Sequence, residues 1–140
     1  MTFDLGFQAA QRLGLTCVSL DPASDSPASQ VAAHVVGALD DPRAVGELLR
    51  RCRRATLENE FIPADVIRKA CVLAEVPEDH LMPGIDTLAT IQDKLRQREA
   101  LAASCVPSPR AVPLEGDAGR AREEIGFPMV LKARFGGYDG

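Results

Sequence analysis

The sequence lacks the features that mark nucleic-acid-binding, membrane and secreted proteins. It has no excess of basic residues: 16 Lys and Arg stand against 20 Asp and Glu, for a net charge of −4. A general nucleic-acid or anionic-membrane surface is therefore not expected. No apolar run approaches the roughly 18 residues of a membrane span, and no basic segment followed by an apolar one opens the printed chain. We expect a cytoplasmic protein with neither nucleic acid nor membrane as a partner.

The four cysteines also lack the spacing of a metal or redox site. Cys17, Cys52, Cys71 and Cys105 are scattered along the chain, and none belongs to a Cys-x-x-Cys pair. Neither zinc nor a redox disulfide is indicated, and no metal ligand is predicted in this chain. Buried, reduced thiols are the expectation.

The first part of the chain alternates helical and strand-like patterns. With 46% hydrophobic and 26% charged residues, the 140-residue chain is expected to be globular. The expected order is helix 3–13, strand 15–20, a strand within 30–38, helix 42–52, strand edge 55–57 and helix 64–73. Short strands alternating with helices of about ten residues predict an α/β fold with a parallel sheet.

The second part follows a Pro-Gly turn at residues 81–84. Its patterns predict a helix over 85–91, another from 93, strand-like residues 110–114, a helix over 116–125 and a short buried strand at 129–131. We therefore expect a first domain over 1–83, a linker over 84–91 and the incomplete beginning of a second domain over 92–140.

The end of the chain contains the residues that most strongly suggest a ligand-binding site. Lys132 closes the apolar run 129–131, and Gly136, Gly137 and Gly140 follow. A desolvated ammonium needs an anionic partner, and glycines let backbone N–H groups approach phosphate oxygens. The pattern suggests a nucleoside triphosphate site. The alternative is a hairpin whose lysine reaches solvent, because the segment lacks the Gly-Lys-Ser/Thr of a Walker loop.

Two other charged clusters leave alternatives open. Glu58 and Glu60 stand between a predicted strand and a helix opened by Pro63, where open parallel sheets place ligands, although loop carboxylates are commonly only solvated. The arginines of 50–54 could hold phosphate, but at a helix C-terminus a solvated face is favoured.

The segment Lys132-Ala-Arg-Phe-Gly-Gly-Tyr-Asp-Gly140 resembles the glycine loop of the ATP-grasp ligases, and within them the 5-(carboxyamino)imidazole ribonucleotide synthases. The resemblance covers nearly the whole chain. Its motifs occur in the family's order: Leu-Asp-Pro, an acidic loop, Ile-Gln-Asp-Lys-Leu, Gly-Phe-Pro, then the lysine and the glycines. It implies a pre-ATP-grasp domain followed by the start of an α+β ATP-grasp lobe, truncated at both ends. The family's first strand and Gly-Gly-Gly-Gln-Leu turn would precede Met1.

The resemblance also implies an activity and its partners. The family uses ATP, Mg²⁺ and bicarbonate to carboxylate aminoimidazole ribonucleotide, and its full-length members are expected to be homodimers. By resemblance, the ATP-binding residues are Lys94, Lys132, Gly136, Gly137 and Gly140, the catalytic residues Tyr138 and Asp139, and the substrate-loop candidates Glu58 and Glu60. The magnesium ligands would lie outside this chain.

The sequence departs from the family pattern at two positions. Lys94 replaces the arginine of many relatives, which removes a bidentate fork, and Phe61 replaces an asparagine of the acidic loop. We expect this chain alone to be inactive. Two alternatives remain open: a non-catalytic packing or dimerisation module, and another ATP-grasp carboxylase or ligase.

Overall fold

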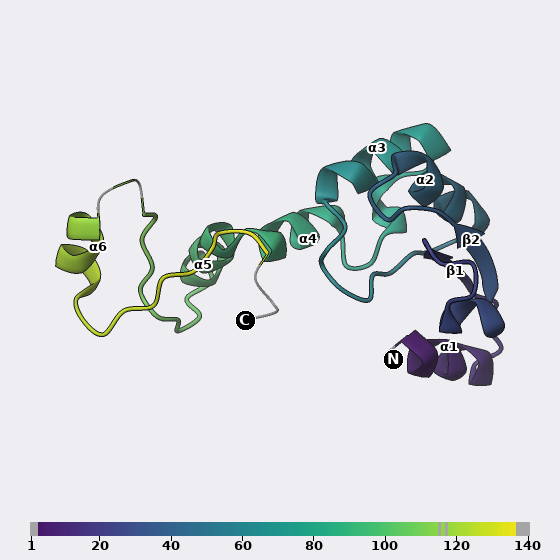
Figure 1. Cartoon of the computed structure of the whole chain (residues 1–140), viewed down its shortest axis with the longest axis horizontal. Helices are drawn as coiled ribbons and strands as arrows, with labels where there is room; N and C mark the ends of the chain where they lie inside the picture. The colour runs from purple at the N-terminus through teal and green to yellow at the C-terminus, as the bar shows by residue number, and fades with distance from the viewer. Residues whose placement is uncertain (1–2, 115, 117, 137–140) are drawn as a thin grey trace. The chain divides into compact units, whose positions relative to one another are not determined.

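The structure is a computed structural model that describes residues 3–114, 116 and 118–136. The chain divides into two compact units, Met1–Leu88 and Ala89–Gly140. The elements, labelled in Figure 1, are α1 (Phe3–Arg12), β1 (Val18–Asp21), η1 (Pro27–Gln30), β2 (Ala33–Val36), α2 (Pro42–Arg51), α3 (Ala64–Ala74), η2 (Glu78–His80), α4 (Ile85–Gln92), α5 (Lys94–Ala103) and α6 (Ala118–Ile125).

The first unit has the predicted α/β architecture with a parallel strand pair. β1 and β2 run parallel, with Val18 opposite Ala33 and Asp21 opposite Val36. The first strand begins at Val18 rather than at residue 15, because only residues from 18 on have partners in β2. The predicted strand edge 55–57 is reduced to a single parallel bridge between Ala55 and Leu81.

The core of the first unit lies where α2 and α3 pack together and α2 covers the strands (Figure 1). Asp41 caps α2 by accepting a hydrogen bond from the amide of Arg43, and Pro42 opens the helix. The largest fully buried side chains are Leu49, Ile67 and Leu81. All the buried apolar residues of the described chain lie in this unit. Its fold therefore rests on an ordinary hydrophobic core.

The second unit departs from the prediction. Its helices α5 and α6 lie where they were expected, but residues 110–114 and 129–131 form no strand. The prediction of a buried strand at 129–131 is wrong: Val130 and Leu131 are 79% and 78% exposed. A strand requires a neighbouring strand to receive its backbone hydrogen bonds, and no described residue pairs with either segment.

The cysteines are all free, as expected, but only Cys71 is buried, and Cys105 is exposed. Burial raises the pKa of the Cys52 and Cys71 thiols. Among the described residues, no helix combines the length and the apolar character needed to cross a membrane.

Candidate functional site

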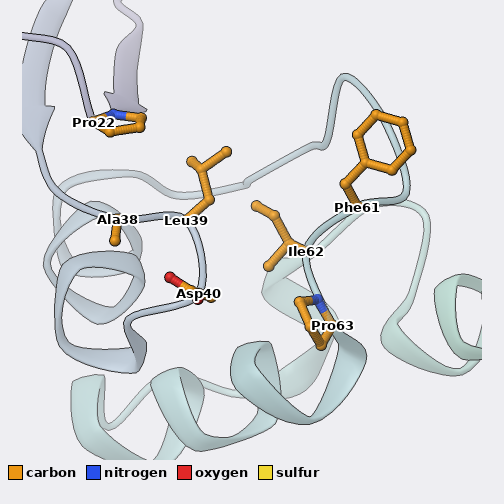
Figure 2. Close-up of a pocket in the computed structure, with 7 residues that line it drawn as sticks. All are labelled: Pro22, Ala38, Leu39, Asp40, Phe61, Ile62 and Pro63. Carbon is orange, nitrogen blue, oxygen red and sulfur yellow. The ribbon is translucent and has the colours of Figure 1, made fainter. Parts of the chain in front are cut away.

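A small hollow lies at the carboxyl ends of β1 and β2 in the first unit (Figure 2). Three segments form its walls: Pro22 after β1, residues 38–40 after β2, and residues 61–63 before α3. Leu39 and Ile62 come from opposite walls, and Asp40 contributes a carboxylate. Its volume is about 260 Å³. That is below the roughly 300–1,000 Å³ of sites that enclose a whole ligand, so the hollow could hold only part of a nucleotide-sized molecule.

The acidic loop adjoins this hollow through its apolar end. Asn59 Oδ1 accepts a hydrogen bond from the amide of Phe61 at 3.0 Å, which turns the chain towards the hollow. Phe61 lines the hollow, whereas Glu58 is exposed, Glu60 is half-buried, and neither is among the lining residues. The loop therefore lies at the carboxyl ends of the strands, as predicted, but its apolar residues form the wall.

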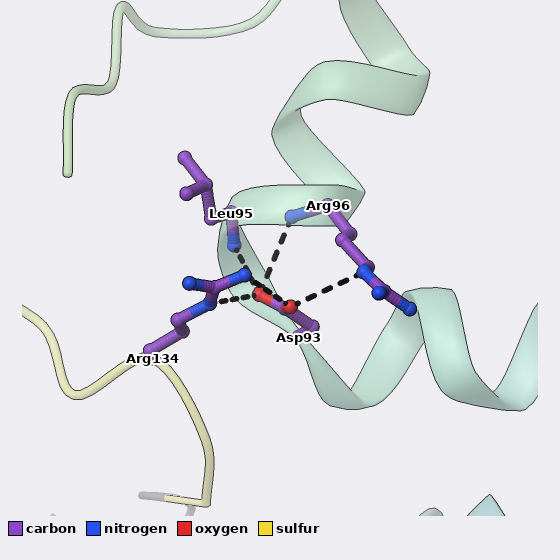
Figure 3. Close-up of polar contacts among 4 residues, drawn as sticks. All are labelled: Asp93, Leu95, Arg96 and Arg134. Atoms are coloured by element: carbon purple, nitrogen blue, oxygen red, sulfur yellow. Dashed lines mark hydrogen bonds and ion pairs between the residues drawn. The ribbon is translucent and has the colours of Figure 1, made fainter.

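A separate cluster forms in the second unit around Asp93, which separates α4 from α5 (Figure 3). Asp93 is the N-cap of α5: its Oδ1 accepts hydrogen bonds from the amides of Leu95 and Arg96 at 3.1 and 3.3 Å. The same carboxylate accepts two hydrogen bonds from the guanidinium of Arg134, from Nε to Oδ1 and from Nη2 to Oδ2, both at 2.7 Å; we call this pair of bonds the Asp93 fork. The fork joins the start of α5 to a residue just before the glycines.

Electrostatics in this cluster favour the charged forms. The Asp93 side chain is only 5% exposed, while that of Arg134 is 52% exposed. The hydrogen bond from Arg134 is the largest cause that lowers the pKa of Asp93 to about 2, and the amides of Arg96 and Leu95 add to it. In turn, the hydrogen bond to Asp93 raises the pKa of Arg134. Arg96 makes a longer ion pair with the same carboxylate, 3.6 Å from Nε to Oδ2.

Lys94 adds two main-chain contacts at the same place. Its backbone N–H donates to the carbonyl oxygen of Arg134 at 3.0 Å, and its Nζ donates to the carbonyl oxygen of Gly136. Gly136 has a φ of 65°, which a glycine adopts without the strain that a side chain would cause. The structure therefore brings together two of the predicted ATP-binding residues, Lys94 and Gly136.

Lys132, the other predicted ATP-binding residue that the structure describes, is not joined to this pair. Lys132 is exposed, and it forms no hydrogen bond or ion pair with the described residues. The expectation that it ends a buried strand is therefore wrong, for the reason given for residues 129–131. Gly137, Tyr138, Asp139 and Gly140 lie outside the described residues.

Sequence reasoning did not assign Asp93 or Arg134 to the site. The signal was present, because an aspartate directly before a helical pattern is a typical N-cap, and an arginine beside glycines is a ready partner for its carboxylate. What the pattern could not give was the pairing of two segments so distant in sequence. Within the described ranges, no group of three or more His, Cys, Asp or Glu is placed to hold a metal ion.

Comparison with known proteins identifies a family match and several relatives. Residues 5–92 match the family described as ribonucleotide synthetase pre-ATP-grasp domain. The N5-carboxyaminoimidazole ribonucleotide synthase of Staphylococcus aureus (strain COL) is 35% identical over 136 residues, which are 95% of this chain and 35% of that protein. The chain thus spans about a third of the length of the curated relatives that it matches.

Solved structures agree with this match. The crystal structure of N5-carboxyaminoimidazole ribonucleotide synthetase from Thermotoga maritima superposes with a TM-score of 0.82 at 31% identity, covering 94% of this chain and 35% of the other. The Staphylococcus aureus synthetase complexed with ADP gives a TM-score of 0.80 at 29% identity, covering 95% and 36%. Both similarities extend over the two units of the chain.

Proposed function

Because the chain belongs to the ribonucleotide synthetase pre-ATP-grasp family, we propose that it is the N-terminal portion of an ATP-dependent ligase that carboxylates aminoimidazole ribonucleotide with bicarbonate. In this reaction ATP passes its terminal phosphoryl group to bicarbonate, giving ADP and carboxyphosphate, and the carboxylate then passes to the amine of the nucleotide with release of phosphate. The substrate in this proposal comes from the names of the relatives, and the use of ATP is supported by the structure of one relative complexed with ADP.

The observation that supports a nucleotide site in this chain is the contact between Lys94 and Gly136. It places an ammonium at the first of the glycines, where backbone amides and a cation could act on the same phosphate. Asp93 already occupies the first amides of α5, so the helix N-terminus is committed to its own cap. The phosphate would therefore be bound by lysines and glycines rather than by the helix end.

We assign the remaining residues by resemblance to the family. Lys132 would contact a phosphate of ATP, and Gly137 and Gly140 would close over it with Gly136. Tyr138 and Asp139 would face the substrate. Glu58 and Glu60 would belong to the substrate loop, beside the hollow lined by Leu39 and Ile62.

The proposal includes Mg²⁺, a cytoplasmic location and a homodimer of the longer protein. Mg²⁺, with its ligands outside this chain, would neutralise the charge that develops on the phosphate oxygens during transfer. We further propose that residues 1–83 are the pre-ATP-grasp domain, 84–91 a linker and 92–140 the beginning of the ATP-grasp domain. The boundary between the two compact units falls inside the proposed linker, which supports this division.

The proposal is tested by adding ADP to the ¹⁵N-labelled chain and following its amide NMR signals. We expect the signals of Lys94, Lys132 and Gly136 to shift. Lys132→Ala should weaken ADP binding about ten- to a hundredfold, because a hydrogen bond to a charged group contributes about 1.5–3 kcal/mol. Lys69→Ala is the matched control, since Lys69 is an exposed lysine of α3 that pairs with Asp65. Equal loss of affinity in the two variants would count against a specific site.

A packing or dimerisation module is the second candidate, and one observation favours it. Phe127, Val130, Leu131 and Phe135 expose most of their surface within one short segment, and exposed apolar clusters recruit other chains. Sedimentation of the purified chain distinguishes the candidates: a module of this kind would self-associate and leave ADP unbound.

A further inference from the structure

We infer that Asp93 is a positioning residue that holds Arg134, and with it the residues leading into Gly136, against the start of α5. This inference rests on the proposed nucleotide site and deepens it, since it concerns how the glycines are held before a nucleotide arrives. Three contacts hold two residues of this segment: the Asp93 fork and the Lys94 amide hold Arg134, and Lys94 Nζ holds the carbonyl oxygen of Gly136.

The fork is specific in geometry as well as in charge. Arg134 donates from Nε and Nη2 to different oxygens of one carboxylate, which a lysine cannot do. The carboxylate is itself fixed, because the amides of Leu95 and Arg96 hold Oδ1 and the side chain is almost completely buried. Asp93 is therefore a rigid anchor, and Arg134 is the attached partner.

The anchor acts on a segment that has little else to hold it. Residues 130–136 are exposed and belong to no helix or strand, and they contribute none of the buried apolar residues. A segment without apolar contacts is normally mobile, and ordering it when a ligand binds would reduce affinity. Because Asp93 already fixes Arg134, less of the segment has to become ordered when a nucleotide binds.

A purely structural role for Asp93 as a helix cap must be separated from this positioning role. Asp93→Asn separates them, because asparagine is as good an N-cap as aspartate and can still accept from the amide of Leu95. It loses the charge, and its amide group cannot accept both N–H donors of the Arg134 fork. Arg96→Ala is the matched control, since it removes the other arginine that contacts this carboxylate and leaves the fork intact.

The test measures hydrogen exchange and ADP binding on the ¹⁵N-labelled 140-residue chain. In the unliganded chain we expect the Arg134 Nε–H and the Lys94 amide to be protected from exchange. Asp93→Asn should reduce that protection about tenfold, equivalent to ~1.4 kcal/mol, and should weaken ADP binding by a similar factor. The amide signals of α5 beyond Arg96 should keep their positions in Asp93→Asn, and Arg96→Ala should match the unmodified chain in both measurements.

The outcomes separate this inference from the proposed function. Loss of protection together with weaker ADP binding supports both. Unchanged protection at Lys94 and Arg134 in Asp93→Asn overturns the inference, whether or not ADP binds. ADP binding that is equally tight in Asp93→Asn also overturns it and leaves the nucleotide site in place. If the unmodified chain does not bind ADP, the proposed site fails, and the exchange measurement alone then decides whether Asp93 positions the segment.

Discussion

Lys94 and Arg134 are joined through their main chains, with the amide nitrogen of Lys94 3.0 Å from the carbonyl oxygen of Arg134. The contact resembles one backbone hydrogen bond of a pair of strands, but it stands alone at the start of a helix. The two hydrogen bonds between Asp93 and Arg134 beside it hold the segments together in place of further backbone bonds. The end of the described chain is thus held by charge rather than by burial. Its response to pH, salt and substitution should follow from that.

The first prediction concerns the titration of Asp93. Its pKa is lowered to about 2 in the folded chain, against roughly 3.9 in an unfolded one. Because the folded pKa is the lower of the two, the stabilisation is complete above about pH 4 and is lost as the pH falls towards 2. Carboxyl ¹³C NMR of Asp93 should give a midpoint near 2, and Arg134→Met should raise it towards the unfolded value.

Arg96→Ala provides the comparison for this titration. The guanidinium Nε of Arg96 lies 3.6 Å from Asp93 Oδ2, beyond the distance of the Arg134 contacts. Its removal should therefore move the midpoint less than Arg134→Met does. A larger movement in Arg96→Ala would show that the fork is not the main cause of the lowered pKa.

The second prediction concerns the core of the first unit. Leu49 of α2 is 1% exposed, so Leu49→Ala should reduce the free energy of unfolding by about 2–5 kcal/mol through lost burial and a residual cavity. Leu13→Ala is the matched control at a residue that is 76% exposed, where a change within about 0.5 kcal/mol is expected. Urea unfolding followed by circular dichroism makes the comparison, and similar losses in the two variants would contradict the assigned core.

The third prediction concerns the close approach of the chain at Gly37. A Cβ added there would lie 2.5 Å from the Cβ of Ala44, which cannot move without moving α2. Gly37→Ala should therefore destabilise the first unit by about 1–3 kcal/mol. Gly84→Ala, where an added Cβ meets nothing within 4 Å, should leave the urea midpoint nearly unchanged. A Gly37→Ala variant as stable as the unmodified chain would mean that β2 and α2 are not this close.

Local signals in the sequence predicted the first unit well. The sequence Asp41-Pro42 is a typical helix start and opens α2, and Gly14, with a φ of 72°, lies just after the end of α1, where a glycine C-cap is common. The parallel pairing followed from the alternation of strands and helices. Each of these signals depends on only a few neighbouring residues, so it predicts the local structure even when the three-dimensional contacts are unknown.

Contacts between distant segments set the limit of this prediction. Residues 129–131 have strand-like composition, but composition does not provide a neighbouring strand, and the described residues offer none. For the same reason the site was only half predicted: Lys94 and Gly136 were named, while the pairing of Asp93 with Arg134 was not. A fork between two segments depends on their arrangement in space, which no local pattern encodes.

The fourth prediction is that the purified chain does not hydrolyse ATP in the presence of aminoimidazole ribonucleotide and bicarbonate. Among the described residues, no group of three or more His, Cys, Asp or Glu is placed to hold a metal ion, and phosphoryl transfer depends on cations that neutralise the phosphate oxygens. Phosphate release should stay at the level of a blank without protein. Release that depends on the nucleotide substrate and is abolished by Lys132→Ala would contradict this expectation.

A phosphate site formed by Lys94, Lys132 and the glycines at the end of the chain can be tested by paramagnetic broadening with Mn²⁺–ADP. The manganese ion sits on the phosphates and broadens the amide signals nearest to them, and Mn²⁺ alone serves as the control. We expect selective broadening at Lys94, Lys132 and Gly136. Broadening centred instead on the arginines of residues 50–54, or spread evenly along the chain, would contradict it.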